Sequence, residues 1–335
     1  MIRHTILYML LTFVLLSAAS VINCQPSPKP PVPKVYKVCI TQIVTHSDLD
    51  NARRGFIDTM TEEGFKEAVN TEYILKIADG DIAVADSIAD YFVSIKPDLI
   101  HSISTPSSQS VVAAARDTDI PIVFSTVTDP VSAGLIPSWT KGAPNVTGVS
   151  NWADVTTQIR FILEIYPEVK KLGVIYNPNE INSVIQIEKL TGEIAPELDL
   201  TIVEATALTS DDVQSAAISL VGKVDAVWIP TDNAVFAAFD SIRQVTDKND
   251  IPLFGSTTAM VEAGAVAGAG VDYYWIGKQC ATMAARIMRG EAAPSEITPE
   301  KCKYMLFAVN LQAADRMGII IPQAAVDKAQ LIIKQ

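Results

Sequence analysis

The sequence predicts an α/β protein with two Rossmann-like lobes, each built on a parallel β-sheet flanked by helices. From residue 35 onward, short runs of β-branched residues alternate with longer segments of helical periodicity. The alternation runs through two successive series, and the roughly 300 residues involved exceed one ordinary hydrophobic core. Strands that alternate with helices at this spacing form parallel sheets with right-handed crossovers.

The predicted elements follow one another in a regular order. The first series predicts strands at 36–44, 72–77, 98–103 and 122–126, and helices at 49–64, 83–95 and 107–116. After a loop at 128–150, the second series predicts helices at 156–165, 181–195, 210–221 and 233–247, and strands at 172–176, 200–205, 226–229 and 252–254. The glycine-rich stretch 264–270 lacks the helix start of a dinucleotide site, so we interpret it as a small-residue strand at a crossing between lobes.

The first 34 residues have the composition of an export signal followed by a linker. The apolar stretch from 6 to about 22 follows a short charged start, which is more typical of a secretory signal than of a membrane span. Val21-Ile22-Asn23-Cys24 resembles a bacterial lipoprotein cleavage site, which predicts removal of 1–23 and a lipid on Cys24. A plain signal peptide is the alternative, because Asn23 replaces the usual small residue. The proline-rich linker 24–34 forms neither helix nor sheet, and it would hold the domain near a membrane that the chain does not cross.

Composition excludes several classes of function. Of the 335 residues, 49% are hydrophobic and 19% are charged, so the chain can bury a sizeable core. The net charge of −12 argues against a nucleic-acid partner, which binds basic surfaces. The four cysteines and three histidines lack metal-ligand spacing, so we expect no metal site. Cys39 is predicted to be a buried thiol on a strand. Cys280 and Cys302 can form a disulfide in an oxidising compartment, and the sequence does not decide whether they do.

The loops that follow the strands are the predicted binding site, because parallel sheets bind ligands beyond the carboxyl ends of their strands. These loops are 45–49, 104–108, 125–130, 177–183, 230–234 and 255–258. They carry hydroxyls, amides and one or two carboxylates, a set that suits a small zwitterion. The ligand carboxylate would lie against the helix start at Ser107 and Ser108, and its ammonium would need Asp232 or Asp129. For each loop taken alone, an ordinary cap or turn is the alternative.

Two aromatic residues near these loops are further candidates. Trp152 follows the first lobe and Tyr273 lies near the return to it, so both can stack on an apolar or aromatic part of the ligand. Ordinary packing between the lobes is the alternative for both. No nucleophile elbow, phosphate loop or dinucleotide motif is present, which favours binding over catalysis and predicts no cofactor.

The order of several short motifs resembles a known family. The matching stretches are 45–50, 120–130, 145–150, 173–178, 230–233, 271–274 and 310–318. Together they resemble the substrate-binding proteins of ABC importers that have the type I periplasmic-binding fold. Within these, the chain is similar to the branch for aromatic amino acids.

The resemblance implies an architecture, a partner and a set of site residues. It implies three crossings between lobes, with 35–150 plus 258–300 in the first lobe and 151–257 plus 301–335 in the second. It also implies a monomer outside the cytoplasm that clamps an amino acid and hands it to an ABC permease with a cytoplasmic ATPase. Ser107, Ser108 and Thr126 would hold the ligand carboxylate. The residues expected to complete the site from the second lobe are Asn177, Asn182, Asp232, Asn233 and Ser256.

Other functions remain open at this point. One is a binding protein for a sugar, a nucleoside or an amide, and another is a membrane-tethered sensor that binds a ligand and feeds a signalling partner. An enzyme on the same fold is disfavoured, because no acid, base and nucleophile converge in the sequence.

Overall fold

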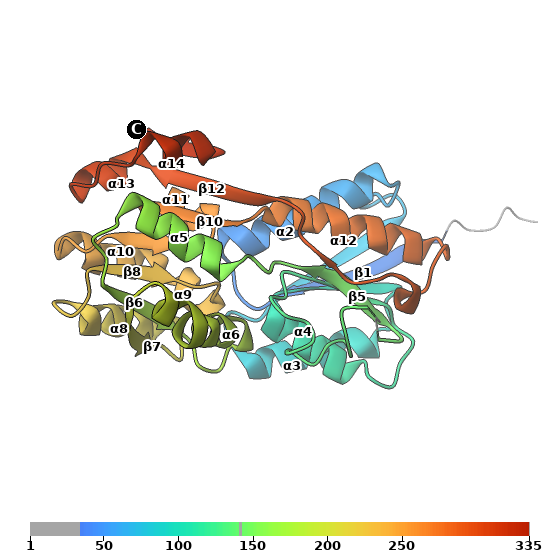
Figure 1. Cartoon of the computed structure of the whole chain (residues 1–335). Coiled ribbons are helices and arrows are strands. Elements are labelled where there is room, and N and C mark those ends of the chain that lie inside the picture. Colours follow the sequence, from blue (N-terminus) through green and yellow to red (C-terminus); the bar gives the residue numbers. More distant parts are fainter. Residues whose placement is uncertain (1–33, 141–142, 335) are drawn as a thin grey trace, which may run out of the picture. The chain divides into compact units, whose positions relative to one another are not determined.

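The computed structural model describes residues 34–140 and 143–334, so the predicted signal peptide, Cys24 and nearly all of the linker lie outside the described residues. Val35–Gln335 forms one compact unit. Two β-sheets lie within it, and helices cover both faces of each sheet (Figure 1). This arrangement confirms the predicted α/β fold with two lobes.

The first lobe contains a six-stranded sheet in the order β11-β5-β4-β3-β1-β2, and all of its paired strands are parallel. The strands are β1 (Tyr36–Gln42), β2 (Thr71–Ile77), β3 (Leu99–Ile103), β4 (Ile122–Ser125), β5 (Val146–Ser150) and β11 (Glu300–Lys301). The helices are α2 (Ser47–Glu62), α3 (Ile82–Ser94), α4 (Thr105–Ala114), α12 (Tyr273–Met288) and the short η3 (Pro294–Glu296).

The second lobe contains a seven-stranded sheet in the order β13-β12-β10-β9-β8-β6-β7, in which only the β10–β12 pair is antiparallel. The strands are β6 (Lys171–Tyr176), β7 (Thr201–Thr206), β8 (Ala226–Ile229), β9 (Leu253–Gly255), β10 (Ala267–Val271), β12 (Met305–Asn310) and β13 (Leu331–Ile333). The helices are α5 (Val155–Ile165), α6 (Ile181–Lys189), η1 (Leu190–Ile194), α7 (Ala195–Glu197), η2 (Ser210–Asp212), α8 (Val213–Leu220), α9 (Asn233–Ala237), α10 (Phe239–Lys248), α11 (Thr258–Glu262), α13 (Leu311–Arg316) and α14 (Gln323–Lys328).

The chain crosses between the sheets three times, but one crossing differs from the prediction. It leaves the first sheet after β5, returns between β10 and α12, and leaves again between β11 and β12. Assigning 258–271 to the first lobe was therefore wrong, because β10 pairs with β9 and β12 of the second sheet. Its glycines permit this, since a Cβ on Gly270 would lie 2.4 Å from the Ser256 carbonyl oxygen. The interpretation of 264–270 as a small-residue strand before a crossing is confirmed for β10.

Two helices of the first lobe pack unusually closely and fix the position of the loop after β1. α2 and α12 lie together on one face of the sheet, while α3 and α4 cover the other (Figure 1). A Cβ on Gly277 of α12 would lie 2.0 Å from the Ala52 carbonyl oxygen, and a Cβ on Gly55 of α2 would lie 2.1 Å from that of Tyr274. Only glycine permits this approach, which anchors α2 and the loop that leads into it.

The remaining differences concern cysteines and one strand. Cys39, Cys280 and Cys302 are free thiols, so Cys280 and Cys302 do not form the disulfide that the sequence allowed. Cys39 is buried within β1, as expected. The loop predicted at 128–150 ends in the buried strand β5, which the glycine in its centre hid from the strand pattern.

Candidate functional site

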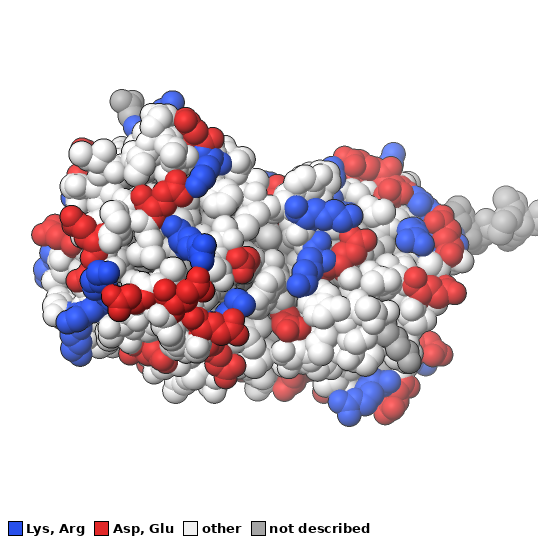
Figure 2. Space-filling view, in the orientation of Figure 1, with Lys and Arg blue, Asp and Glu red and all other residues white. Residues whose placement is uncertain are grey.

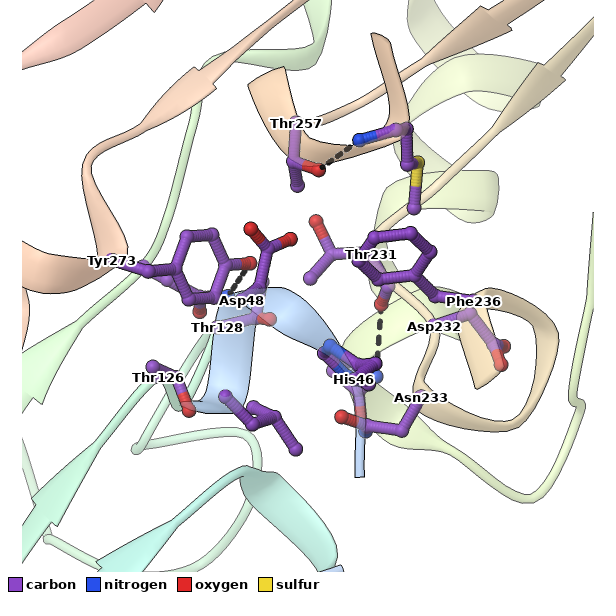
Figure 3. Close-up of a pocket in the computed structure, with 14 residues that line it drawn as sticks. His46, Asp48, Thr126, Thr128, Thr231, Asp232, Asn233, Phe236, Thr257 and Tyr273 are labelled. Atoms are coloured by element: carbon purple, nitrogen blue, oxygen red, sulfur yellow. Dashed lines mark hydrogen bonds between the residues drawn. The ribbon is translucent and has the colours of Figure 1, made fainter. Parts of the chain in front are cut away.

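A cavity lies where loops of the two lobes face each other, and fourteen residues line it (Figure 3). The space that a water-sized sphere can occupy within it is only about 10 Å³, room for about one water molecule, so the two walls of the cavity lie close together. Five of the predicted site residues line it: Thr126, Asn182, Asp232, Asn233 and Tyr273.

The loops after β3 and β4 hold strained backbone beside this cavity. Ser104 has φ 85° and ψ 158°, a region that only glycine occupies readily, and Thr126 has φ 56°. The Ser104 N–H donates to the Thr126 hydroxyl oxygen at 2.9 Å and to the Ser125 carbonyl oxygen at 3.1 Å. Residues held in such conformations cluster at binding sites. These two hydrogen bonds hold the end of β4 against the start of α4.

The start of α4 gathers buried hydroxyls that have no hydrogen-bond partner in the protein. These belong to Ser104, Thr105 and Ser107, whose side chains are all nearly inaccessible. The first N–H groups of a helix are also free of partners within the helix, and they carry its positive partial charge. An anion is the ligand that such a helix start accepts best.

One buried carboxylate of the cavity, Asp48, is a residue that the sequence did not single out. It lies in the first turn of α2 and is 3% exposed, and its carboxylate faces the Thr257 hydroxyl (Figure 3). Burial raises its pKa from the usual 3.8 to about 7. Beside it, the Tyr273 hydroxyl accepts a hydrogen bond from the Asn151 side chain at 2.8 Å. A buried carboxylate without a cationic partner is a natural counterion for an ammonium group.

Asp232 occupies the opposite wall but is already engaged by the backbone. Its two carboxylate oxygens accept from the N–H groups of Asn177 at 2.7 Å and of Val235 at 3.0 Å. Burial, followed by the charge of the neighbouring Glu180, raises its pKa to about 8. Glu180 in turn accepts from the Asn182 side chain at 2.9 Å and from the backbone N–H of Asn233 at 3.1 Å. These two carboxylic acids hold together the loops after β6 and β8.

The other predicted residues lie close by but do not line the cavity. The Ser108 hydroxyl of α4 lies 2.8 Å from the Ser102 hydroxyl of β3, and Asp129 accepts from the N–H groups of Val131 and Ser132, so both side chains are already engaged within the protein. The side chain of Asn177 donates to the Leu208 carbonyl oxygen, and the Ser256 hydroxyl contacts Thr231. Ser107 and Trp152 likewise stand outside the lining set, Trp152 being partly buried just after β5.

The residues that the sequence analysis missed come largely from the same set of loops. They are His46, Asp48, Leu49, Thr128, Asn151, Thr231, Phe236, Thr257 and Met260. The rule that selects loops after strands names 45–49 and so includes His46 and Asp48. That rule gives no reason, however, to prefer His46 and Asp48 over the other residues of the loop that leads into α2.

Buried polar atoms without partners concentrate here. Among the described residues, thirteen buried side-chain atoms lack a hydrogen-bond partner, and eight of them belong to the loops around the cleft. They are both ring nitrogens of His46, the hydroxyls of Ser104, Thr105, Ser107 and Thr128, and the side-chain oxygens of Asn151 and Asn182. Folded proteins leave few such atoms unsatisfied, so a local cluster indicates a place where a polar ligand binds.

Other kinds of site are not found in the described part of the chain. Within residues 34–140 and 143–334, no group of three or more His, Cys, Asp or Glu side chains is arranged to hold a metal. None of the helices described there is long and apolar enough to cross a membrane. Figure 2 shows acidic and basic side chains interspersed on the face in view, without a continuous basic stripe.

Comparison with known proteins assigns the chain to a family. The sequence model described as ABC transporter substrate binding protein matches residues 37–333. The chain belongs to the family of ABC transporter substrate-binding proteins. This substrate-binding protein is 38% identical over 259 residues to a tyrosine-binding protein of Clostridioides difficile (strain R20291), which covers 77% of this chain and 74% of the relative.

Two solved structures resemble the substrate-binding protein to different degrees. One is the ABC domain in complex with L-Trp from Streptococcus pneumoniae, at 28% identity and a TM-score of 0.85, covering 90% of this chain and 100% of that one. The other is the ligand-free, open structure of a substrate binding protein from Clostridium difficile, at 33% identity and a TM-score of 0.67, with the same coverage of 90% and 100%. The structure of lower sequence identity therefore superimposes better.

Proposed function

We propose that this chain is the extracytoplasmic component of an ABC importer and captures an aromatic amino acid in the cleft between its lobes. The observation that carries the proposal is the group of eight buried polar atoms without protein partners, five of them on residues that line the cavity and three at the start of α4, together with the buried carboxylate of Asp48. A zwitterion presents the two opposite charges that these groups accept.

The proposed ligand lies with its carboxylate toward α4 and its ammonium toward α2. The hydroxyls of Thr126 and Thr128, in the loop after β4, line the cavity and are proposed to hold the carboxylate next to the start of α4, where Ser107 stands outside the lining. Asp48 receives the ammonium. It takes the role that the sequence analysis gave to Asp232 or Asp129, because Asp232 and Asp129 already accept backbone N–H groups.

The rest of the cavity suits an apolar, ring-bearing side chain. Leu49, Phe236 and Met260 supply apolar surface, and Tyr273 supplies an aromatic face. One relative is a tyrosine-binding protein and another was solved in complex with L-Trp, and both support an aromatic ligand. Trp152 does not line the cavity, so we propose that it packs between the lobes and does not contact the ligand.

The lobes are proposed to be closed as they would be around a ligand. The better superposition on the L-Trp complex than on the ligand-free, open structure supports this, because the order of sequence identity is the reverse. Two-lobed binding proteins of this kind open and close about the strands that join their lobes.

We further propose that the protein works as a monomer that delivers its ligand to an ABC permease with a cytoplasmic ATPase, and that a lipid on Cys24 retains it at the membrane. It is proposed to bind without catalysis. The His46 ring nitrogens meet no hydroxyl at hydrogen-bond distance, so the cavity contains no paired base and nucleophile.

A ligand screen tests the proposal. Purified protein would be subjected to thermal unfolding with each of the twenty amino acids, with sugars and with nucleosides, and each stabilising compound would be titrated by calorimetry. We expect stabilisation by tyrosine, tryptophan or phenylalanine, because a ligand that binds only the folded state raises the unfolding temperature. Stabilisation by sugars or nucleosides alone would contradict the proposal.

A further inference from the structure

His46 is the cavity residue whose chemistry the proposed site leaves unused. It follows β1 and immediately precedes α2, and its side chain points into the cavity between Asn233 and Phe236 (Figure 3). The position is that of an N-cap, yet the His46 side chain makes no capping hydrogen bond. Helix capping therefore does not explain why a histidine stands here.

His46 as a whole is partly buried, but both of its ring nitrogens are buried and have no hydrogen-bond partner. Neither Nδ1 nor Nε2 has a partner at bonding geometry, although the Asn233 side chain lies nearby. The nearest aromatic ring is that of Phe236, whose centroid lies 4.7 Å away at a tilt of 48°. A buried polar group without a partner is expensive, so a ligand that supplies one gains affinity at this position.

The protonation state of His46 defines which partner it needs. Burial lowers its pKa from 6.5 to about 4, so the ring is neutral at pH 7. A neutral imidazole has one nitrogen that donates and one that accepts. Its unprotonated nitrogen can accept a hydrogen bond from a neutral donor on the ligand.

The charged ends of the ligand already have their own groups. In the proposed orientation the carboxylate lies at Thr126 and Thr128 and the ammonium at Asp48, which leaves His46 and Phe236 for the side chain of the ligand. Phe236 offers a ring to stack on, and His46 offers an acceptor beside it.

We propose that His46 determines which aromatic amino acid binds, by accepting a hydrogen bond from a donor on the ligand ring. The phenol O–H of tyrosine and the indole N–H of tryptophan supply that donor, whereas phenylalanine has none. The inference rests on the proposed function and deepens it. A site built to hydrogen-bond such a group rejects an analogue that lacks it, because the buried partner is then left unpaired.

The first test needs no variant. Tyrosine and phenylalanine differ by one oxygen atom, and calorimetric titration of the wild-type protein would give their dissociation constants. We expect tyrosine to bind at least about tenfold more tightly than phenylalanine, the ratio of one ordinary hydrogen bond. Equal affinities would overturn the role of His46 and leave the proposed function intact. Binding of neither would overturn the proposed function itself.

The second test assigns the preference to His46. His46→Leu is expected to abolish the preference, with tyrosine weakened at least tenfold and phenylalanine changed less than threefold. Thr59→Val is the matched control, since it removes another buried polar group without a partner from α2, outside the cavity, and should leave both affinities unchanged. If His46→Leu weakens both amino acids equally, His46 contacts the part that they share and the inference is wrong.

Discussion

Replacing Asp48 by asparagine tests the position of the ligand ammonium most directly. The substitution keeps the size of a side chain that is 3% exposed and removes its charge. Removing one member of a buried ion pair costs about 3–5 kcal/mol. Because the asparagine oxygen can still accept one hydrogen bond, we expect the lower end, which is roughly a 100-fold weaker affinity. Calorimetric titration with the amino acid that the screen identifies measures this directly.

The pH dependence provides a second signature of the same carboxylate. With burial raising the pKa of Asp48 to about 7, the ligand ammonium must displace a proton below that pH. The affinity of the wild-type protein should therefore fall as the pH decreases from 7 to 5, and Asp48→Asn should remove that dependence.

The stability of the ligand-free protein should respond in the opposite sense. The unfolded chain has the usual carboxyl pKa of 3.8, so the folded protein binds more protons between pH 4 and 7 and loses stability as the pH rises through this window. The Asp48→Asn side chain does not ionise, so the variant does not lose stability in this window. It should therefore unfold at a higher temperature than the wild type at pH 8. Such a gain in stability together with a loss of affinity would indicate that Asp48 serves ligand binding at a cost in stability.

Asp232→Asn is the matched control for these measurements. Asp232 ties together the loops after β6 and β8 through the N–H groups of Asn177 and Val235. Losing one such bond should lower stability by about 1–2 kcal/mol and change affinity less than tenfold. If instead Asp232→Asn abolishes binding and Asp48→Asn does not, the ammonium lies at Asp232 and our placement is refuted.

Two further predictions concern a hydroxyl and a glycine. Thr128→Val should weaken ligand binding about tenfold in calorimetry without loss of thermal stability, because its hydroxyl has no protein partner. The matched Thr147→Val should do the reverse and lower the unfolding free energy by about 1–3 kcal/mol, since the Thr147 hydroxyl donates to the Ile297 carbonyl oxygen at 2.8 Å. Gly277→Ala should destabilise the protein by about 3 kcal/mol or more in chemical denaturation, because its Cβ would lie 2.0 Å from the Ala52 carbonyl oxygen. A Gly277→Ala protein as stable as the wild type would show that α2 and α12 can separate freely.

The sequence predicts the elements of the fold far better than their pairing. Local periodicity predicts β1 to β4 and β6 to β9 within a few residues, since each is a short β-branched run between helical segments. It cannot predict that β10 joins the second sheet, because that depends on contacts with β9 and β12. β11 has only two residues and is a strand solely because it pairs with β5.

The site is predictable to the extent that it follows from strand ends. The rule that the carboxyl ends of parallel strands meet at one edge selected the loops that contain Thr126, Asn182 and Asp232, and the family resemblance then named Thr126 and Asn182 within them. Asp48 was missed because an acidic residue near the start of a helix has an ordinary explanation in the helix dipole. His46 was missed because it stands at the N-cap position of the same helix, where a polar residue is expected. Only the burial of the Asp48 side chain and of the His46 ring nitrogens distinguishes these two residues from solvent-exposed capping residues.

The unpartnered atoms also bear on how the lobes would close. Eight buried polar atoms without protein partners, at about 1 kcal/mol each, would cost about 8 kcal/mol, which is comparable to the whole stability of a domain. When the lobes separate, water can reach these groups, so the protein alone gains little by closing. A ligand that bonds to them favours the closed form by its differential affinity for that form, and only such a difference can shift the population. The same atoms that define the ligand would therefore make closure depend on it, since a compound unable to satisfy them would leave most of that cost in place.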